Sequence, residues 1–116
     1  MVNFVADNKT SLENKEALLK IKKFFYAELP NFELSEEFDS ESNYNGFRIQ
    51  YVNKGNIIVL SSSWRGMEHE ILIDDKVFSL LNFEPQMGEI LSCSITNLNF
   101  TLVVLKRFID EQNTIV

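Results

Sequence analysis

The sequence predicts an α+β domain: an N-terminal helix, a four- or five-stranded antiparallel β-meander and a C-terminal helix packed on the sheet. Residues 46–83 contain four short β-rich segments separated by three turn signals, at the regular spacing of a meander. Apolar residues at helical spacing flank this stretch on both sides. At 116 residues, of which 45% are hydrophobic, the chain can build one core without a metal or a disulfide. We therefore expect a single domain over residues 1–116.

The N-terminal helix is predicted to begin at a capping box, residues 10–13, in which Thr10 caps the amide of Glu13 and the Glu13 carboxylate reaches back. Leu18, Ile21 and Phe25 follow at helical spacing and form the apolar side of the helix. Pro30 ends it, because proline lacks the N–H that a helix interior needs. The lysines of this segment suit the negative C-terminal half of a helix, so we assign them no membrane or nucleic-acid role.

An acidic segment, residues 28–46, follows the helix. It holds six acidic side chains and no Lys or Arg, so its charge of −6 equals the net charge of the whole chain. We interpret it as a connector within the domain, and we expect some of its apolar residues, such as Phe32 and Phe38, to pack on the rest of the domain. An acidic segment with interspersed aromatics is also typical of a ligand for a basic protein surface, because complementary charge steers the encounter and aromatic residues anchor it.

The register of the meander follows from its turns. Three dipeptides are predicted to form two-residue hairpin loops: Lys54-Gly55, Arg65-Gly66 and Asp75-Lys76. Ile49 then lies opposite Leu60, Leu60 opposite Ile71, and Ile71 opposite Leu80. All the strongest apolar residues fall on one face, and a slip of one residue would destroy that agreement, which therefore supports the register.

The opposite face of the predicted sheet mixes apolar side chains such as Ile57, Val59 and Leu72 with the carboxylates of Glu68 and Glu70. This composition fits two arrangements. We expect a helix to cover its apolar half. The alternative is a partner-binding patch, since a large exposed apolar area with a polar rim is typical of association.

The second turn of the meander carries Trp64 and Arg65, which are residue types enriched at interface anchors. A structural role is the alternative, in which Trp64 folds back over the sheet edge and its indole N–H finds a carbonyl. Both readings stay open at this point.

Beyond the meander, the weak alternation of residues 89–95 favours a fifth strand, with Cys93 as a small core residue. A second helix is predicted over residues 96–113, with Asn97 as its N-cap. This helix is apolar around much of its circumference, so it should be largely buried against the sheet and against the first helix or a second copy of the chain. Its β-branched residues leave a strand that leads into a shorter helix as the alternative.

Chemistry-bearing residues are few. His69 is the only histidine, and Glu68 and Glu70 point away from it in a strand, so these three residues cannot form a metal site together. Neither a phosphate-binding loop nor a nucleophile elbow is present. We therefore expect no catalytic site, no metal and no cofactor. The net charge disfavours nucleic acid, no apolar run is long enough to span a membrane, and the N-terminus has no secretion signal, so the expected location is cytoplasmic.

The sequence thus favours a non-catalytic protein-binding domain, of the immunity or inhibitor type that neutralises a basic toxin or enzyme. The candidate partner-binding residues are Glu33, Glu36, Glu37, Asp39, Glu41, Trp64, Arg65, Glu68 and Glu70. One alternative is a small acidic chaperone or adaptor that binds a client peptide as a homodimer. The other is a small enzyme that uses His69 with Glu68 or Glu70, which a concave pocket containing His69 would favour.

Overall fold

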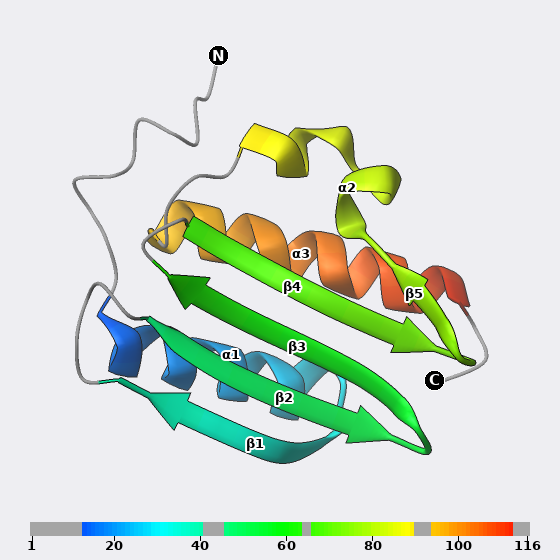
Figure 1. Cartoon of the computed structure of the whole chain (residues 1–116), viewed down its shortest axis with the longest axis horizontal. Coiled ribbons are helices and arrows are strands. Elements are labelled where there is room, and N and C mark those ends of the chain that lie inside the picture. The colour runs from blue at the N-terminus through cyan, green and yellow to red at the C-terminus, as the bar shows by residue number, and fades with distance from the viewer. Residues whose placement is uncertain (1–12, 41–45, 64–65, 90–93, 113–116) are drawn as a thin grey trace.

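The computed structural model describes residues 13–40, 46–63, 66–89 and 94–112 (Figure 1). The elements in chain order are helix α1 (Asn14–Glu28), strands β1 (Glu33–Asp39), β2 (Phe47–Asn53), β3 (Asn56–Ser63), β4 (Gly66–Ile73) and β5 (Lys76–Phe78), helix α2 (Leu80–Phe83), the 3₁₀ helix η2 (Pro85–Glu89) and helix α3 (Ile95–Gln112). The five strands form one antiparallel sheet in the order β1-β2-β3-β4-β5. The predicted α+β architecture is confirmed.

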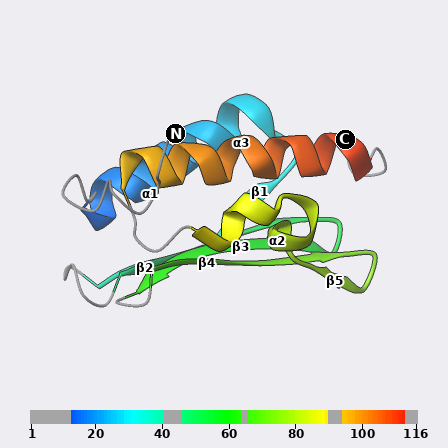
Figure 2. The same ribbon diagram turned by 90° about the horizontal axis from the view of Figure 1, so that it is seen from above.

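The molecule has two layers. Figure 2 shows α1 and α3 on the same side of the sheet, where they contact each other. The core lies between these helices and the sheet and includes Phe25, Ile49, Leu60, Ile71 and Leu105, each with no more than 1% of its surface exposed. We call the helix-covered side of the sheet the inner face and the other side the outer face. Among the described residues no helix lies over the outer face, so the helical cover expected there is not found.

Helix α1 begins later than predicted. Its N-cap is Glu13, which forms a capping box with Glu16: the Glu13 amide donates to Glu16 Oε1 at 3.4 Å. The sequence placed Glu13 inside the helix and Thr10 at the cap, whereas residues 10–12 lie outside the described part of the chain. The apolar side is as predicted, because Leu18, Ile21 and Phe25 are all buried.

The acidic segment supplies the fifth strand. Residues 33–39, interpreted as part of a connector, form β1 at the edge of the sheet and pair with β2. Residues 89–95, predicted as the fifth strand, do not form one in the described part of the chain: Glu89 ends η2 and Ile95 begins α3, while residues 90–93 with Cys93 lie outside it. An edge strand needs no buried face, and every side chain from Glu33 to Phe38 is exposed.

Helix α3 starts two residues before its predicted N-cap. Ser94 caps it, because the amide of Asn97 donates to Ser94 Oγ at 3.2 Å. Asn97 therefore lies in the first turn, where it is fully buried. The helix is otherwise the buried element that the sequence predicts, with Leu98, Leu102 and Leu105 all in the core.

The register is confirmed for the first hairpin and shifted in the other two. Ile49 lies opposite Leu60, as predicted. Ile71, however, pairs with Ile58 and with Phe78, a shift of two residues on each side. Because the side-chain period of a strand is two, this error leaves each residue of β3 and β4 on its predicted face.

Turn chemistry explains the shift of the third hairpin. The third loop is formed by Asp74 and Asp75, which adopt φ values of 53° and 65°, as a type I′ hairpin loop requires. Aspartate tolerates this left-handed region better than most residues. Gly66, predicted in the second loop, is instead the first residue of β4, with φ 115°, and pairs with Ser63.

Candidate partner-binding surface

Cross-strand neighbours align on the outer face in three rows, because directly opposed residues of antiparallel strands share a face. The first row runs through Glu33, Val52, Ile57, Leu72 and Val77. The second row runs through Glu36, Gln50, Val59 and Glu70. The third row runs through Phe38, Arg48, Ser61 and Glu68. The outer face therefore has an apolar end, and its carboxylates lie on β1 and β4, on either side of β2 and β3.

Exposure varies across this face. Val59, at its centre, is only 3% exposed, although no described helix covers it. Its cross-strand neighbours on this face are Gln50 and Glu70. Val77 at one corner is 83% exposed and Phe38 at the opposite edge is 59% exposed. The outer face thus presents large apolar side chains to solvent beside half-buried ones.

Charge on the outer face is mostly uncompensated. Glu36 forms an ion pair with Arg48, whose Nη1 donates to Glu36 Oε1 at 2.7 Å. Within the described part of the chain Glu33, Glu68 and Glu70 take part in no ion pair. The face therefore carries four carboxylates against one guanidinium.

The nine predicted partner-binding residues divide into three groups. Glu33 and Glu36 on β1 and Glu68 and Glu70 on β4 share the outer face, with β2 and β3 between the two pairs. Glu37 and Asp39 lie on the inner side of β1, towards α1. Glu41, Trp64 and Arg65 lie outside the described residues. A bulge between Leu34 and Glu36 produces this division, because it shifts the alternation of β1 so that Glu33 and Glu36 share one face.

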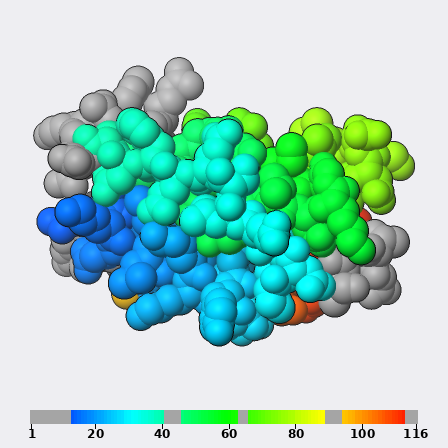
Figure 3. Space-filling view, turned by 90° about the horizontal axis from the view of Figure 1, so that it is seen from below, coloured from blue at the N-terminus to red at the C-terminus, as the bar shows by residue number. Residues whose placement is uncertain are grey.

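The two inner carboxylates hold β1 against α1. Lys22 Nζ donates to Glu37 Oε2 at 2.9 Å, and Asn14 Nδ2 donates to Asp39 Oδ1 at 3.2 Å. Asn14 Nδ2 also reaches the carbonyl of Gly46 at 3.0 Å. Figure 3 shows β1 and α1 side by side on this edge of the molecule. Glu37 and Asp39 therefore stabilise the contact between β1 and α1, whereas the carboxylates of the outer face point to solvent.

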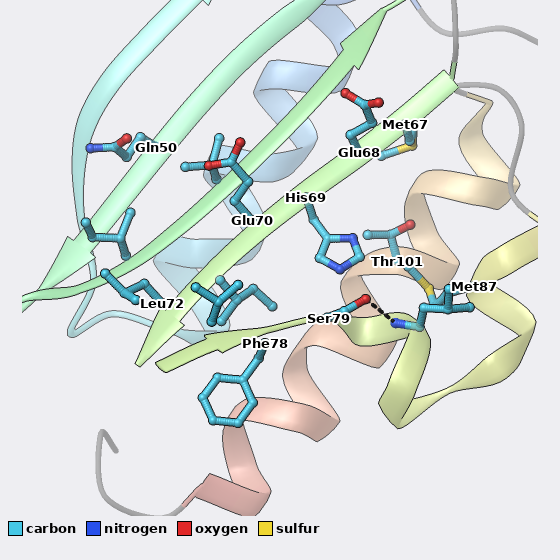
Figure 4. Close-up of a pocket in the computed structure, with 15 residues that line it drawn as sticks. Gln50, Met67, Glu68, His69, Glu70, Leu72, Phe78, Ser79, Met87 and Thr101 are labelled. Carbon is cyan, nitrogen blue, oxygen red and sulfur yellow. Dashed lines mark hydrogen bonds between the residues drawn. The ribbon is translucent and has the colours of Figure 1, made fainter. Parts of the chain in front are cut away.

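A hollow of about 780 Å³ lies along β4 (Figure 4). We call it the β4 hollow. At one end it is bounded by side chains of the outer face, including Glu70 and Leu72, and at the other by Met87 and Thr101. Figure 4 shows His69 between β4 and these last two residues. Neither the hollow nor its contact with η2 and α3 could be read from the sequence, because their positions depend on where β5 ends.

His69 determines where β5 ends. The amide of Leu80 donates to His69 Nε2 at 2.8 Å, so the ring is neutral, with its proton on Nδ1. Burial lowers the pKa of His69 below its usual 6.5, which favours this neutral form. If the β4–β5 ladder continued from the pair of Ile71 and Phe78, Leu80 would stand opposite His69. The imidazole takes the Leu80 N–H instead, and the chain leaves the sheet to form α2, which Ser79 Oγ caps.

A scan against protein-family models found no match, and comparisons with curated proteins and with solved structures found none either. Within the described ranges, no group of three or more His, Cys, Asp or Glu side chains is arranged to hold a metal ion. No described helix has both the length and the apolar character that crossing a membrane requires. The outer face and the β4 hollow are two surface features of the described residues that could bind a partner or a ligand.

Proposed function

We propose that this chain is a non-catalytic protein-binding domain of the immunity or inhibitor type, which neutralises a basic toxin or enzyme by covering it with the outer face. One observation carries the proposal. The outer face combines an apolar row that ends at the exposed Val77 with carboxylates, of which Glu33, Glu68 and Glu70 lack an ion pair in the described part of the chain. Apolar area supplies affinity, and uncompensated charge supplies fast and selective encounter.

The distribution of charge supports a directional interaction. Basic side chains gather on the helical side of the molecule, where Lys20, Lys23 and Lys106 line a hollow of about 610 Å³ between α1 and α3. The negative charge of the outer face is therefore separated from most of the positive charge by the thickness of the core. The unpaired carboxylates of the outer face attract a basic partner to that side of the molecule, which orients the encounter.

A charge-reversal experiment tests the proposal. The double variant Glu68→Lys/Glu70→Lys reverses the outer face, while Glu28→Lys/Glu111→Lys makes the same change in net charge on exposed residues of α1 and α3. The partner is captured from the source cells at low salt, identified, and assayed for its own activity with and without the protein. The association rate with the wild type should fall about tenfold or more in the first variant and stay within about twofold in the second.

Three results would contradict the proposal. Equal losses in both double variants would show that net charge matters and the outer face does not. A captured partner whose activity is unchanged by an equimolar amount of the protein would exclude the inhibitor role. Failure to capture any partner at low or moderate salt would remove the proposal altogether.

The β4 hollow is the one observation that favours the enzyme alternative, since His69, Glu68 and Glu70 all line it. Its geometry suits a base poorly, because the Nε2 lone pair of His69 already accepts the Leu80 amide. Glu68 and Glu70 point to the other face of the strand. His69→Gln separates the two functions: protein binding should survive it, whereas an enzyme that uses the imidazole as its base would lose turnover of its substrate.

A further inference from the structure

One stretch of β4 has a strand on one side only. β5 pairs with Ile71, Leu72 and Ile73, and among the described residues no strand pairs with the same side of β4 between Met67 and Glu70. The residues that flank a two-residue hairpin loop exchange hydrogen bonds, and every second residue along the strand then faces the same neighbour. The N–H and C=O groups of Ile73, Ile71, His69 and Met67 therefore point to the β5 side.

The side chain of His69 keeps this stretch open. It accepts the Leu80 amide, which would otherwise pair with the backbone of His69. The chain then turns into α2, so in the described part of the chain the backbone groups of Met67 and His69 face the β4 hollow instead of a longer β5. Among the described residues this row of donors and acceptors has no strand partner. A row of this kind is the template used in strand addition, where an extended peptide joins the edge of a sheet.

The two sides of an added strand would meet different surroundings. Its inward side chains would enter the β4 hollow between β4 and the α2–η2 segment, beside Leu81 and Met87. Methionine adapts to apolar groups of different shape, so this side accepts apolar residues. Its outward side chains would lie next to Glu68 and Glu70, which have no ion pair within the described ranges.

We propose that β4 binds an extended segment of a basic partner, in which apolar side chains that enter the β4 hollow alternate with Lys or Arg side chains that face Glu68 and Glu70. This inference rests on the proposed function and specifies how the partner is bound. Backbone pairing with Met67 and His69 supplies a contact independent of sequence, and the alternation of charge and apolar groups supplies the selectivity.

A second copy of the chain fits this edge poorly. If two β4 strands paired antiparallel about His69, Glu68 of each would lie directly opposite Glu70 of the other. Like charges directly opposite each other destabilise a strand pair. The edge therefore favours a basic segment over a homodimer.

The test uses three capped heptapeptides with the full chain. The first alternates lysine and valine, the second alternates glutamate and valine, and the third is the lysine–valine peptide with N-methyl groups on alternate amides. The lysine–valine peptide should slow hydrogen exchange of the Met67 and His69 amides by at least about tenfold at millimolar concentration, and the other two should not. Glu68→Lys/Glu70→Lys should reverse the preference in favour of the glutamate–valine peptide, whereas Glu28→Lys/Glu111→Lys should leave it unchanged.

The remaining outcomes distinguish failure of this inference from failure of the proposed function. Equal binding of the methylated and unmethylated peptides would show that charge alone attracts them and that no strand is added. No protection by any peptide, with capture of the folded partner intact, would exclude the β4 edge and leave the outer-face proposal standing. Protection by the lysine–valine peptide with no capture of a partner would support the edge and remove the inhibitor role.

Discussion

The two edges of the sheet are built in opposite ways. β1 has seven residues, a bulge and two contacts to α1, through Glu37 to Lys22 and through Asp39 to Asn14. β5 has three residues and ends where the His69 ring takes the Leu80 amide. The β1 edge is thus long and anchored, whereas the opposite edge exposes part of β4. The difference shows that a sheet can protect one edge and keep the other available within a single chain.

Charged residues can have different effects on how readily an edge strand pairs with another chain. Bulges and charged residues on an edge strand discourage pairing with other chains, and β1 has both. The open part of β4 also has charges, Glu68 and Glu70, but no bulge. In the strand addition that we propose, these carboxylates repel acidic strands and attract basic ones.

The largest expected effects come from removing the aromatic residue that supports each edge. Phe25 stacks on Tyr51 with ring centroids 3.8 Å apart, and Phe108 contacts Phe78 and Phe83 at 5.3 and 5.6 Å. Phe25→Ala and Phe108→Ala should each lower the free energy of unfolding by about 3–5 kcal/mol, since each leaves a cavity. Denaturant titration measures the loss.

Hydrogen exchange in the same two variants tests whether the edges are independent. Phe25→Ala should speed exchange most in β1 and β2, and Phe108→Ala most in β5 and α2. Identical exchange patterns in the two variants would show that the sheet opens as one unit and that its two edges are not independently stabilised.

The next largest effect on stability concerns the hydrogen bond from the Leu80 amide to His69 Nε2. His69→Ala leaves the Leu80 amide without its acceptor and should lower the free energy of unfolding by about 1–3 kcal/mol. His69→Gln is the matched control, because its side-chain oxygen can take the place of Nε2 and should recover part of the loss. Equal destabilisation by the two variants would mean that ring packing, and not the hydrogen bond, holds this corner together.

The same bond should make stability depend on pH. Burial lowers the pKa of His69 below 6.5, so the unfolded chain binds this proton at higher pH than the folded chain does. The contribution of the neutral ring is complete above about pH 6.5 and is lost as the pH falls from there towards the folded pKa. Urea titrations at pH 7.5 and 5.5 should show that the stability difference between the wild type and His69→Gln shrinks at the lower pH. A constant difference would contradict the role given to Nε2.

Periodicity explains what the sequence could predict. Helices α1 and α3, the four strands from β2 to β5 and the first hairpin follow from apolar spacing and from Lys54-Gly55. Leu80–Phe83, predicted within the last strand, forms α2 instead. β1 was missed because an edge strand with exposed side chains has no alternation to detect. The third turn was misplaced because Asp74-Asp75 and Asp75-Lys76 are both acceptable turn dipeptides, and only the strained φ values of the two aspartates distinguish them.

The candidate site was predictable only in part. The sequence correctly placed Glu68 and Glu70 on the outer face, because the alternation of side chains along a strand is enough to decide which face they occupy. The placement of Glu33 and Glu36 on the same face depends on the bulge between Leu34 and Glu36, which has no signal in a single sequence. Whether a helix covers the outer face depends on the handedness and length of connections, since an apolar patch looks the same in sequence whether a helix or a partner covers it.

The smallest effect concerns the ion pairs of β1. Glu36 and Glu37 pair with Arg48 and Lys22 at largely solvent-exposed positions, so Glu36→Gln and Glu37→Gln should each lower the free energy of unfolding by only about 0.2–1 kcal/mol, and less at high salt. Glu28→Gln, on the exposed end of α1, is the control for loss of one charge. If the bulge and the packing of α1 protect this edge, hydrogen exchange in residues 33–39 should change little in either variant. A large increase confined to Glu37→Gln would instead assign the protection of β1 to its salt bridge with Lys22, and the two edges would then differ chiefly in which carboxylates have a partner.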